Sequence, residues 1–554
     1  AVSLFLLMVV FKLVSITRFK FDSDESQHMH VIWAWARGFV QYRDVFDNHM
    51  PLFQIMFAPI FALIGDRATI LYWMRFVLLP MYFVGAWCTY RIGELLFSRR
   101  AGIWAVVWAV ILVGLYALYH FTSLEFRTDN LWAPLWLLCV TTLISEALTV
   151  RRALVGGLLL GFCFGISMKS ILLLLALLVS ATIALFLVGR KQLGQSRSHL
   201  ACCAAAFLAA VTLVPGIIAA AFALAGLWRD FRYCNFDHNI LPNVDAKYHS
   251  AWWIIVFPVV FPFAIYAARL IVRATPEAAV AFRRAFIFLI CGFYVLDLRS
   301  FWELLMRQDY LPFYPLAFVF ISGILLAFSS HLVRSDLRPS NYLRRVPLPA
   351  FVALADFFLV LATPRFWINS PQVETNLLRS VLKLTDPGDY VLDCKGETIF
   401  RQRCFWSVME SITLERLNRG LLADDAVERA LETHTCVAVM MGRMPRRTEQ
   451  FIWENYIPVG NDLEVAGRFL KPSAADSRRM DFEVVIPASY EIVAPDGPVE
   501  GMLDGRPYDG ARFLAPGGHT FVQTSSRTQL AFLWAQAVDR NFAPTKFSQP
   551  RPKR

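Results

Sequence analysis

The stretch ILLLLALLVSATIALFLVG, residues 171–189, carries no charged side chain. A helix of that length is about 28 Å long, close to the ~30 Å hydrocarbon thickness of a bilayer. Lipid offers backbone polar groups no hydrogen-bond partner, and a helix satisfies those groups internally. The stretch therefore predicts a membrane-spanning helix, and it decides the fold class.

Further apolar stretches of this kind extend over most of the chain. They are predicted as spans at 1–18, 68–97, 101–119, 130–149, 153–170, 200–226, 251–272, 283–298, 310–330 and 346–363. The apolar stretch 51–65 is too short to cross and is expected to lie along the membrane interface. With 57% hydrophobic and 18% charged residues, the composition excludes a set of soluble domains, disorder and a disulfide scaffold. We expect an all-α polytopic membrane bundle of about eleven spans over residues 1–363.

Residues 364–554 differ in pattern from the rest, because amphipathic and alternating segments replace the apolar stretches. They predict a soluble α/β to β-rich domain. Its expected strands are 390–394, 436–441, 482–486, 490–493, 521–524 and 530–534, and its expected helices lie around 398–418 and 424–433. Spacing leaves disulfide pairing open among Cys394, Cys404 and Cys436, with Cys394–Cys404 preferred.

Charge is distributed unequally between alternate loops. One set holds basic residues such as Arg151 and Arg190, and the other holds acids such as Asp22 and Glu125. Lys and Arg in short loops stay in the cytoplasm, so the acidic loops and residues 364–554 are expected on the periplasmic face of a bacterial inner membrane. The net charge of +11 is then mostly membrane anchoring, and no nucleic-acid partner is indicated.

The first outer loop, residues 19–67, is long and polar, and its aromatic residues argue against disorder. If residues 24–37 form a helix, Asp24 and His28 lie on one face at i and i+4, and Glu25 joins His28 at i and i+3. This arrangement predicts two carboxylates and an imidazole in one patch.

Four motifs in order resemble those of the GT-C membrane glycosyltransferases, most of all the protein O-mannosyltransferase and lipid A aminoarabinose transferase branch. They are Asp24-Glu25, DNHMPL at 47–52, EFRTD at 125–129 and RQDYLPFYP at 307–315. In the second motif His49 stands where Lys is common and Met50 replaces the first Pro. The resemblance covers residues 1–363 and extends only loosely to the rest of the chain.

The resemblance implies transfer of a sugar from a polyprenyl-phosphate donor to a lipid, glycan or protein acceptor, with inversion. It implies Asp24 as general base, with Glu25 beside it. It makes Glu125 and Asp129 the second acidic motif. The candidate cations for the donor phosphate are His49, Arg127, Lys169 and Arg307.

Each assignment has an alternative. Asp24 and Glu25 could cap the following helix. Arg127 could pair with Glu125 or Asp129, Lys169 could extend to the membrane interface, and Arg307 could form a solvated pair with Asp309. A divalent metal is a further alternative, with Asp24, His28 and His49 as its ligands.

Two other functions stay open at this stage. An oligosaccharide ligase with a pyrophosphate-linked donor would share the lipid chemistry. A lipid transporter without chemistry is less favoured, because the spans show no internal repeat and few Gly/Pro-interrupted pairs.

Overall fold

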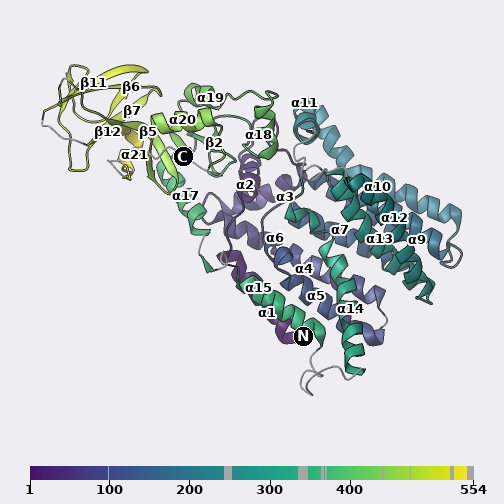
Figure 1. Cartoon of the computed structure of the whole chain (residues 1–554). Coiled ribbons are helices and arrows are strands. Elements are labelled where there is room, and N and C mark those ends of the chain that lie inside the picture. Colours follow the sequence, from purple (N-terminus) through teal and green to yellow (C-terminus); the bar gives the residue numbers. More distant parts are fainter. Residues whose placement is uncertain are drawn as a thin grey trace. The chain divides into compact units, whose positions relative to one another are not determined.

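The computed structural model describes residues 1–97, 99–241, 252–302, 304–334, 347–363, 367–368, 371–439, 442–474, 476–524 and 529–545. The chain divides into two compact units (Figure 1). The first, here the helical unit, comprises Ala1–Phe21, Asn48–Phe57 and Tyr72–Pro371. The second, here the α/β unit, comprises Asp22–Asp47, Ala58–Leu71 and Gln372–Arg554. The first outer loop thus contributes residues to both units.

Every apolar stretch predicted as a span overlaps a helix, with ends that differ by a few residues. These helices are α1 (Val2–Arg18), α4 (Ile70–Leu96), α5 (Arg99–Leu115), α7 (Asp129–Ile144), α8 (Val150–Ile166), α9 (Ser170–Val188), α10 (Arg197–Leu224), α12 (Trp252–Arg273), α13 (Ala278–Phe301), α14 (Tyr314–Arg334) and α15 (Leu348–Leu361). Shorter elements are α3 (Leu52–Ile64), α6 (Ala117–Thr122), α11 (Trp228–Arg232), the π-helix η1 (Tyr233–Asp237) and the 3₁₀-helix η2 (Arg307–Tyr310).

The expected count of about eleven spans is not confirmed. By length and composition, four helices among the described residues could cross a membrane, namely α4, α9, α10 and α13. The number rises to five if α1 and the helix that follows it, α2 (Ser23–Ala36), count as one bent span. Other apolar helices, such as α7 and α15, have fewer than the 18 residues required here of a spanning helix. The chain is therefore a mostly helical membrane protein.

Small residues bring α8 and α10 together. A Cβ on Gly157 would lie 2.3 Å from the Phe207 carbonyl oxygen, and one on Gly161 would lie 2.9 Å from the Val211 carbonyl oxygen. Glycine lets two helix backbones approach to van der Waals contact, which is how helices commonly associate in lipid. Helix α8 ends at Ile166, because the next residue, Ser167, has extended backbone angles (φ −149°, ψ 130°). This break separates α8 from α9.

The α/β unit is built on two sheets. The larger has the strand order β10-β7-β12-β5-β3-β1-β2, with β4 also pairing with β5, and the smaller has the order β6-β11-β8-β9. The strands are β1 (Tyr390–Leu392), β2 (Gln402–Arg403), β3 (Val437–Val439), β4 (Tyr456–Gly460), β5 (Leu463–Leu470), β6 (Arg479–Val484), β7 (Ala488–Val493), β8 (Gly501–Leu503), β9 (Arg506–Pro507), β10 (Arg512–Leu514), β11 (Gly517–Gln523) and β12 (Leu530–Trp534). Its helices besides α2 are α17 (Pro371–Leu384), α18 (Ser411–Asn418), α19 (Ala426–Glu432), α20 (Arg446–Asn455) and α21 (Ala535–Asp539).

Each strand expected from the sequence is present within a few residues, although residues 440–441 of the expected strand 436–441 lie outside the described residues. The helix expected around 398–418 is wrong in its first half. Strand β2 lies there instead, pairing in parallel with β1 through Tyr390↔Gln402, and α18 begins only at Ser411. The preferred Cys394–Cys404 disulfide is also wrong, because both thiols are free. Burial raises the pKa of Cys404 to about 12, which disfavours the thiolate that disulfide formation needs.

The contact between α8 and α10 gives a stability prediction. Gly157→Val should lower the free energy of unfolding by about 3 kcal/mol, because the added side chain meets the backbone of Phe207. Thermal unfolding in detergent measures it. Gly216→Val in α10 is the matched control, since a Cβ there would meet nothing within 4 Å. Equal effects of the two substitutions would refute the close approach.

Candidate functional site

In the helical unit, Lys169 forms a buried ion-pair cluster with two aspartates. Its Nζ lies 3.0 Å from Asp129 Oδ1 and 2.5 Å from Asp309 Oδ1. Lys169 immediately precedes α9, Asp129 is the first residue of α7, and Asp309 belongs to η2. The side chains of Asp129 and Asp309 are only 2% and 1% exposed. The cluster therefore joins three segments that are far apart in sequence.

Neighbouring groups hold this cluster in place. The Met306 backbone N–H donates to Asp309 Oδ2 at 2.7 Å, and the Tyr294 hydroxyl donates to the Asp309 carbonyl oxygen at 2.5 Å. The ring of Trp132 lies 5.8 Å from Lys169 Nζ. Burial on its own lowers the pKa of Lys169, but the two carboxylates outweigh it and raise the pKa, so the ammonium stays charged.

Two expectations about charged residues are corrected by this arrangement. Lys169 contacts carboxylates, so it does not simply extend to the membrane interface. The expected solvated pair between Arg307 and Asp309 is wrong, because Asp309 is buried against Lys169 while Arg307 is exposed.

The second acidic motif lies beside the cluster. Arg127 Nε is 3.9 Å from Glu125 Oε2 and 3.6 Å from Asp129 Oδ2, with all three side chains less than 10% exposed. The Gln308 side chain donates to Glu125 Oε2 at 2.9 Å. His49 is close enough to Asp129 to interact with it electrostatically. The structure thus brings His49, Glu125, Arg127, Asp129 and Lys169 together in one unit.

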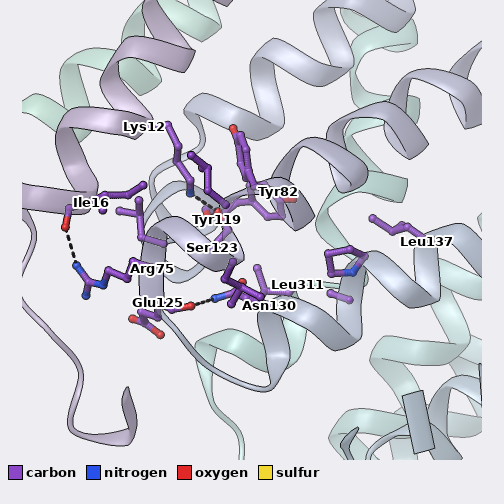
Figure 2. Close-up of a pocket in the computed structure, with 15 residues that line it drawn as sticks. Lys12, Ile16, Arg75, Tyr82, Tyr119, Ser123, Glu125, Asn130, Leu137 and Leu311 are labelled. Atoms are coloured by element: carbon purple, nitrogen blue, oxygen red, sulfur yellow. Dashed lines mark hydrogen bonds between the residues drawn. The ribbon is translucent and has the colours of Figure 1, made fainter. Parts of the chain in front are cut away.

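Glu125 also lines a small cavity together with Lys12, Arg75 and Asn130 (Figure 2). Lys12 Nζ donates to the His120 carbonyl oxygen at 2.8 Å and to Ser123 Oγ at 2.7 Å, and Arg75 donates to the Phe19 carbonyl oxygen at 2.9 Å. The volume open to the centre of a water molecule is about 20 Å³. That is room for about one water, so the cavity is too small for a sugar donor.

Sequence reasoning missed Lys12 and Arg75. The signal was present, because each is a cation inside a predicted apolar span, where charged side chains are costly and are usually retained for a reason. Both are almost fully buried, at 1% exposure, and both bind backbone carbonyl oxygens.

In the α/β unit, α2 presents Asp24. The expected helix is confirmed, and it begins with a capping box. The Asp22 side chain accepts from the Asp24 N–H at 3.0 Å, and Glu25 Oε1 accepts from the Asp22 N–H at 2.9 Å. The alternative that Asp24 and Glu25 cap the helix is thus confirmed for Glu25. The Asp24 carboxylate takes no part in the capping box.

The Asp24 carboxylate is bound by Lys395, a residue that sequence reasoning missed. Lys395 Nζ donates to Asp24 Oδ1, and the two side chains are 6% and 15% exposed. They are separated by 371 positions, and no local pattern signals the pair. Lys395 belongs to residues 393–403, which we call the clamp loop.

Asp393 organises the clamp loop. Its Oδ2 accepts hydrogen bonds from the Thr398 N–H at 3.0 Å and from the Thr398 hydroxyl at 2.7 Å. Its Oδ1 accepts hydrogen bonds from the Gly396 N–H at 3.0 Å and from Arg403 Nε at 2.7 Å. Burial would raise the pKa of Asp393, but Arg403 and these hydrogen bonds lower it. Burial and the nearby Asp393 raise the pKa of Glu397 to about 7. Asp393 is therefore the ionised anchor of the loop.

The clamp loop is fitted to α2. His30 Nδ1 is hydrogen-bonded to the Ile399 carbonyl oxygen at 2.9 Å. Gly396 has a φ of +83°, and a Cβ there would lie 2.7 Å from His30 Cβ. Only glycine fits both the backbone conformation and the space.

A polar groove of about 520 Å³ opens next to these contacts, and it is lined by α2, the first outer loop and β2. Trp406 stands at its side, with its Nε1 donating to the Tyr42 carbonyl oxygen and its ring at 4.8 Å from that of Phe46. Other lining side chains include His30, Asp44, Gln402, Arg403, Asp425 and Arg429. The lining of the groove thus combines aromatic side chains with side chains of both charges.

The alternative of a metal site gains no support. Among the residues that the structure describes, no three His, Cys, Asp or Glu side chains are grouped so that they could hold an ion. Asp24, His28 and His49 are thus not part of such a group.

Comparison with known proteins identifies the fold. No protein-family model and no curated protein sequence matches the chain. Two crystal structures of ArnT from Cupriavidus metallidurans do, one in the apo state and one bound to undecaprenyl phosphate. Each has a TM-score of 0.55 and covers 84% of this chain and 97% of that chain, at 12% and 11% sequence identity. The chain therefore has the fold seen in these ArnT structures.

Proposed function

We propose that this protein transfers a sugar from a polyprenyl-phosphate donor to a lipid, glycan or protein acceptor, with inversion at C1 of the sugar. The observation that carries the proposal is the Asp24 carboxylate, held by Lys395 and not used by the capping box of α2. One of the ArnT structures was solved with undecaprenyl phosphate, which supports a lipid of this class as the carrier.

Asp24 is proposed as the general base. Its carboxylate takes the proton from the acceptor hydroxyl while the acceptor oxygen attacks C1. The bond between C1 and the phosphate oxygen breaks, and polyprenyl phosphate leaves with the bonding electrons. Attack from the face opposite the phosphate inverts the configuration. The ammonium of Lys395 helps to keep the carboxylate ionised and correctly oriented.

The departing phosphate needs cations more than a proton donor. We propose Lys169, Arg127 and His49 for this role, with Asp129 and Asp309 fixing the direction of the Lys169 ammonium. Arg307 is exposed on η2, and we propose that it meets the donor from the solvent side. Glu125 holds Gln308 and Arg127 in place.

We further propose that the reaction occurs on the periplasmic face of a bacterial inner membrane. The separation of acidic from basic loops supports this orientation. A polyprenyl phosphate is anchored in the bilayer, so its sugar can be reached only at the membrane surface.

Replacing the base tests the reaction. Asp24→Asn should reduce transfer from a panel of labelled polyprenyl-phosphate sugars by at least about 10²-fold, because the amide cannot accept the proton. Release of free polyprenyl phosphate is the measurement. Asp66→Asn is the control, an exposed acid of the same loop that pairs with Arg37 and does not line the groove. A fully active Asp24→Asn would exclude Asp24 as the base.

Lys395 can be tested separately as a positioning residue. Lys395→Met should lower kcat by about tenfold or more while leaving KM for the donor nearly unchanged, because the carboxylate loses the charge that orients it. Lys395→Arg should restore much of kcat. Gly396→Val, which displaces the clamp loop from His30, should mimic Lys395→Met. Wild-type kcat in Lys395→Met would reject the role.

Lys169 requires a design that separates charge from folding. Lys169→Met should destabilise the protein by about 3 kcal/mol, because it leaves buried carboxylates unpaired. Adding Asp309→Asn should recover part of that stability. Donor affinity, measured with undecaprenyl phosphate, should stay weakened in the double variant. Recovery of affinity along with stability would show that Lys169 only stabilises the fold.

A further inference from the structure

A second, larger cavity lies in the helical unit. Its volume is about 610 Å³, and it is lined by residues of α7, α8, α9, α10 and α13. Its walls are mainly apolar, formed by side chains such as Leu143, Leu178, Leu185, Phe207 and Phe286. Polar groups occur at a few places only, chiefly Glu146, Gln192, Gln195 and Arg283.

This cavity is remote from the Lys169 cluster. Lys169 precedes α9, whereas the cavity is lined by residues of α9 from Leu177 to Leu185 and by Gln192 beyond its end. A helix of 19 residues is about 28 Å long, roughly one bilayer thickness. In the same way α7 has Asp129 at its first residue and the cavity at its last turn. The cavity therefore belongs to the opposite membrane surface and is no part of the proposed donor site.

Basic residues are close in sequence to the residues that line one end of the cavity. Arg151 lies two residues before the lining residue Ala153, and Arg190, Lys191 and Arg197 flank Gln192 and Gln195. Within the described part of the chain, none of these four forms an ion pair with a carboxylate. Glu146 is paired with Arg152, and Arg283 donates to the Ile144 carbonyl oxygen at 2.8 Å. The edge of the cavity thus carries excess positive charge.

We propose that the cavity binds one anionic phospholipid from this leaflet of the membrane, with an acyl chain inside and the phosphate among the flanking cations. An apolar cavity of this size offers water too few polar partners to fill it, whereas an acyl chain matches its lining. Basic groups between helices at a membrane surface attract anionic head groups. A zwitterionic lipid lacks the net charge, and inorganic phosphate lacks the chain.

Native mass spectrometry of the full-length, delipidated protein in detergent tests the proposal. Titration with phosphatidylglycerol should give one tightly retained lipid per chain, bound at least about tenfold more tightly than phosphatidylcholine. Arg190→Gln/Lys191→Gln should abolish that preference. Arg269→Gln/Arg273→Gln is the matched control, because it removes two basic residues from α12, which does not line the cavity.

Filling the cavity gives an independent readout. Ala181→Trp in α9 should eliminate the retained lipid, whereas Ala209→Trp on the exposed side of α10 should not. A monodisperse peak in size-exclusion chromatography establishes that each variant is folded. Unchanged retention in Ala181→Trp would overturn the cavity as the site. An equal loss of the phosphatidylglycerol preference in the α12 control would show that the preference comes from surface charge in general and not from this cavity. Displacement of the lipid by inorganic phosphate would indicate a simple anion site.

Discussion

The helical unit depends on one ammonium that is shared between two buried carboxylates. Lys169, Asp129 and Asp309 would each be costly to bury alone, and together they satisfy one another. Because they come from the start of α9, the start of α7 and η2, the pairing fixes where these segments begin relative to each other. Tyr294 and Gln308 then extend the same network to α13 and to the second acidic motif.

In the α/β unit, too, a buried charged side chain holds separate segments in place. The carboxylate of Asp393 accepts hydrogen bonds from Thr398, Gly396 and Arg403, and these bonds hold the clamp loop, which contains little regular structure. That conformation carries Lys395 to Asp24. A domain late in the chain thereby supplies a contact to a residue of the first outer loop, and its two sheets serve as the support.

Sequence predicts what depends on neighbouring residues. Apolar stretches located the long helices of the helical unit, and alternation located β1, β3, β6, β7, β11 and β12, because both signals repeat within a few positions. Pairs such as Lys169 with Asp309, or Asp24 with Lys395, are separated by 140 and 371 positions, so only the fold brings them together. The helix expected around 398–418 failed for a related reason: pairing of β2 with β1 overrides the local helical pattern.

In the proposed reaction, the charges around Lys169 limit how the donor phosphate can be bound. Lys169 and Arg127 contribute two cations, while Glu125, Asp129 and Asp309 contribute three carboxylates. If all are ionised, this set carries a net charge of −1 before any phosphate arrives. The ammonium of Lys169 therefore orients the phosphate through hydrogen bonds, but the set as a whole provides no net positive charge. The phosphate must then obtain further positive charge from outside the set. Among the candidates His49 and Arg307 fit best, because His49 acts on Asp129 and Arg307 stays exposed on η2 beside Asp309.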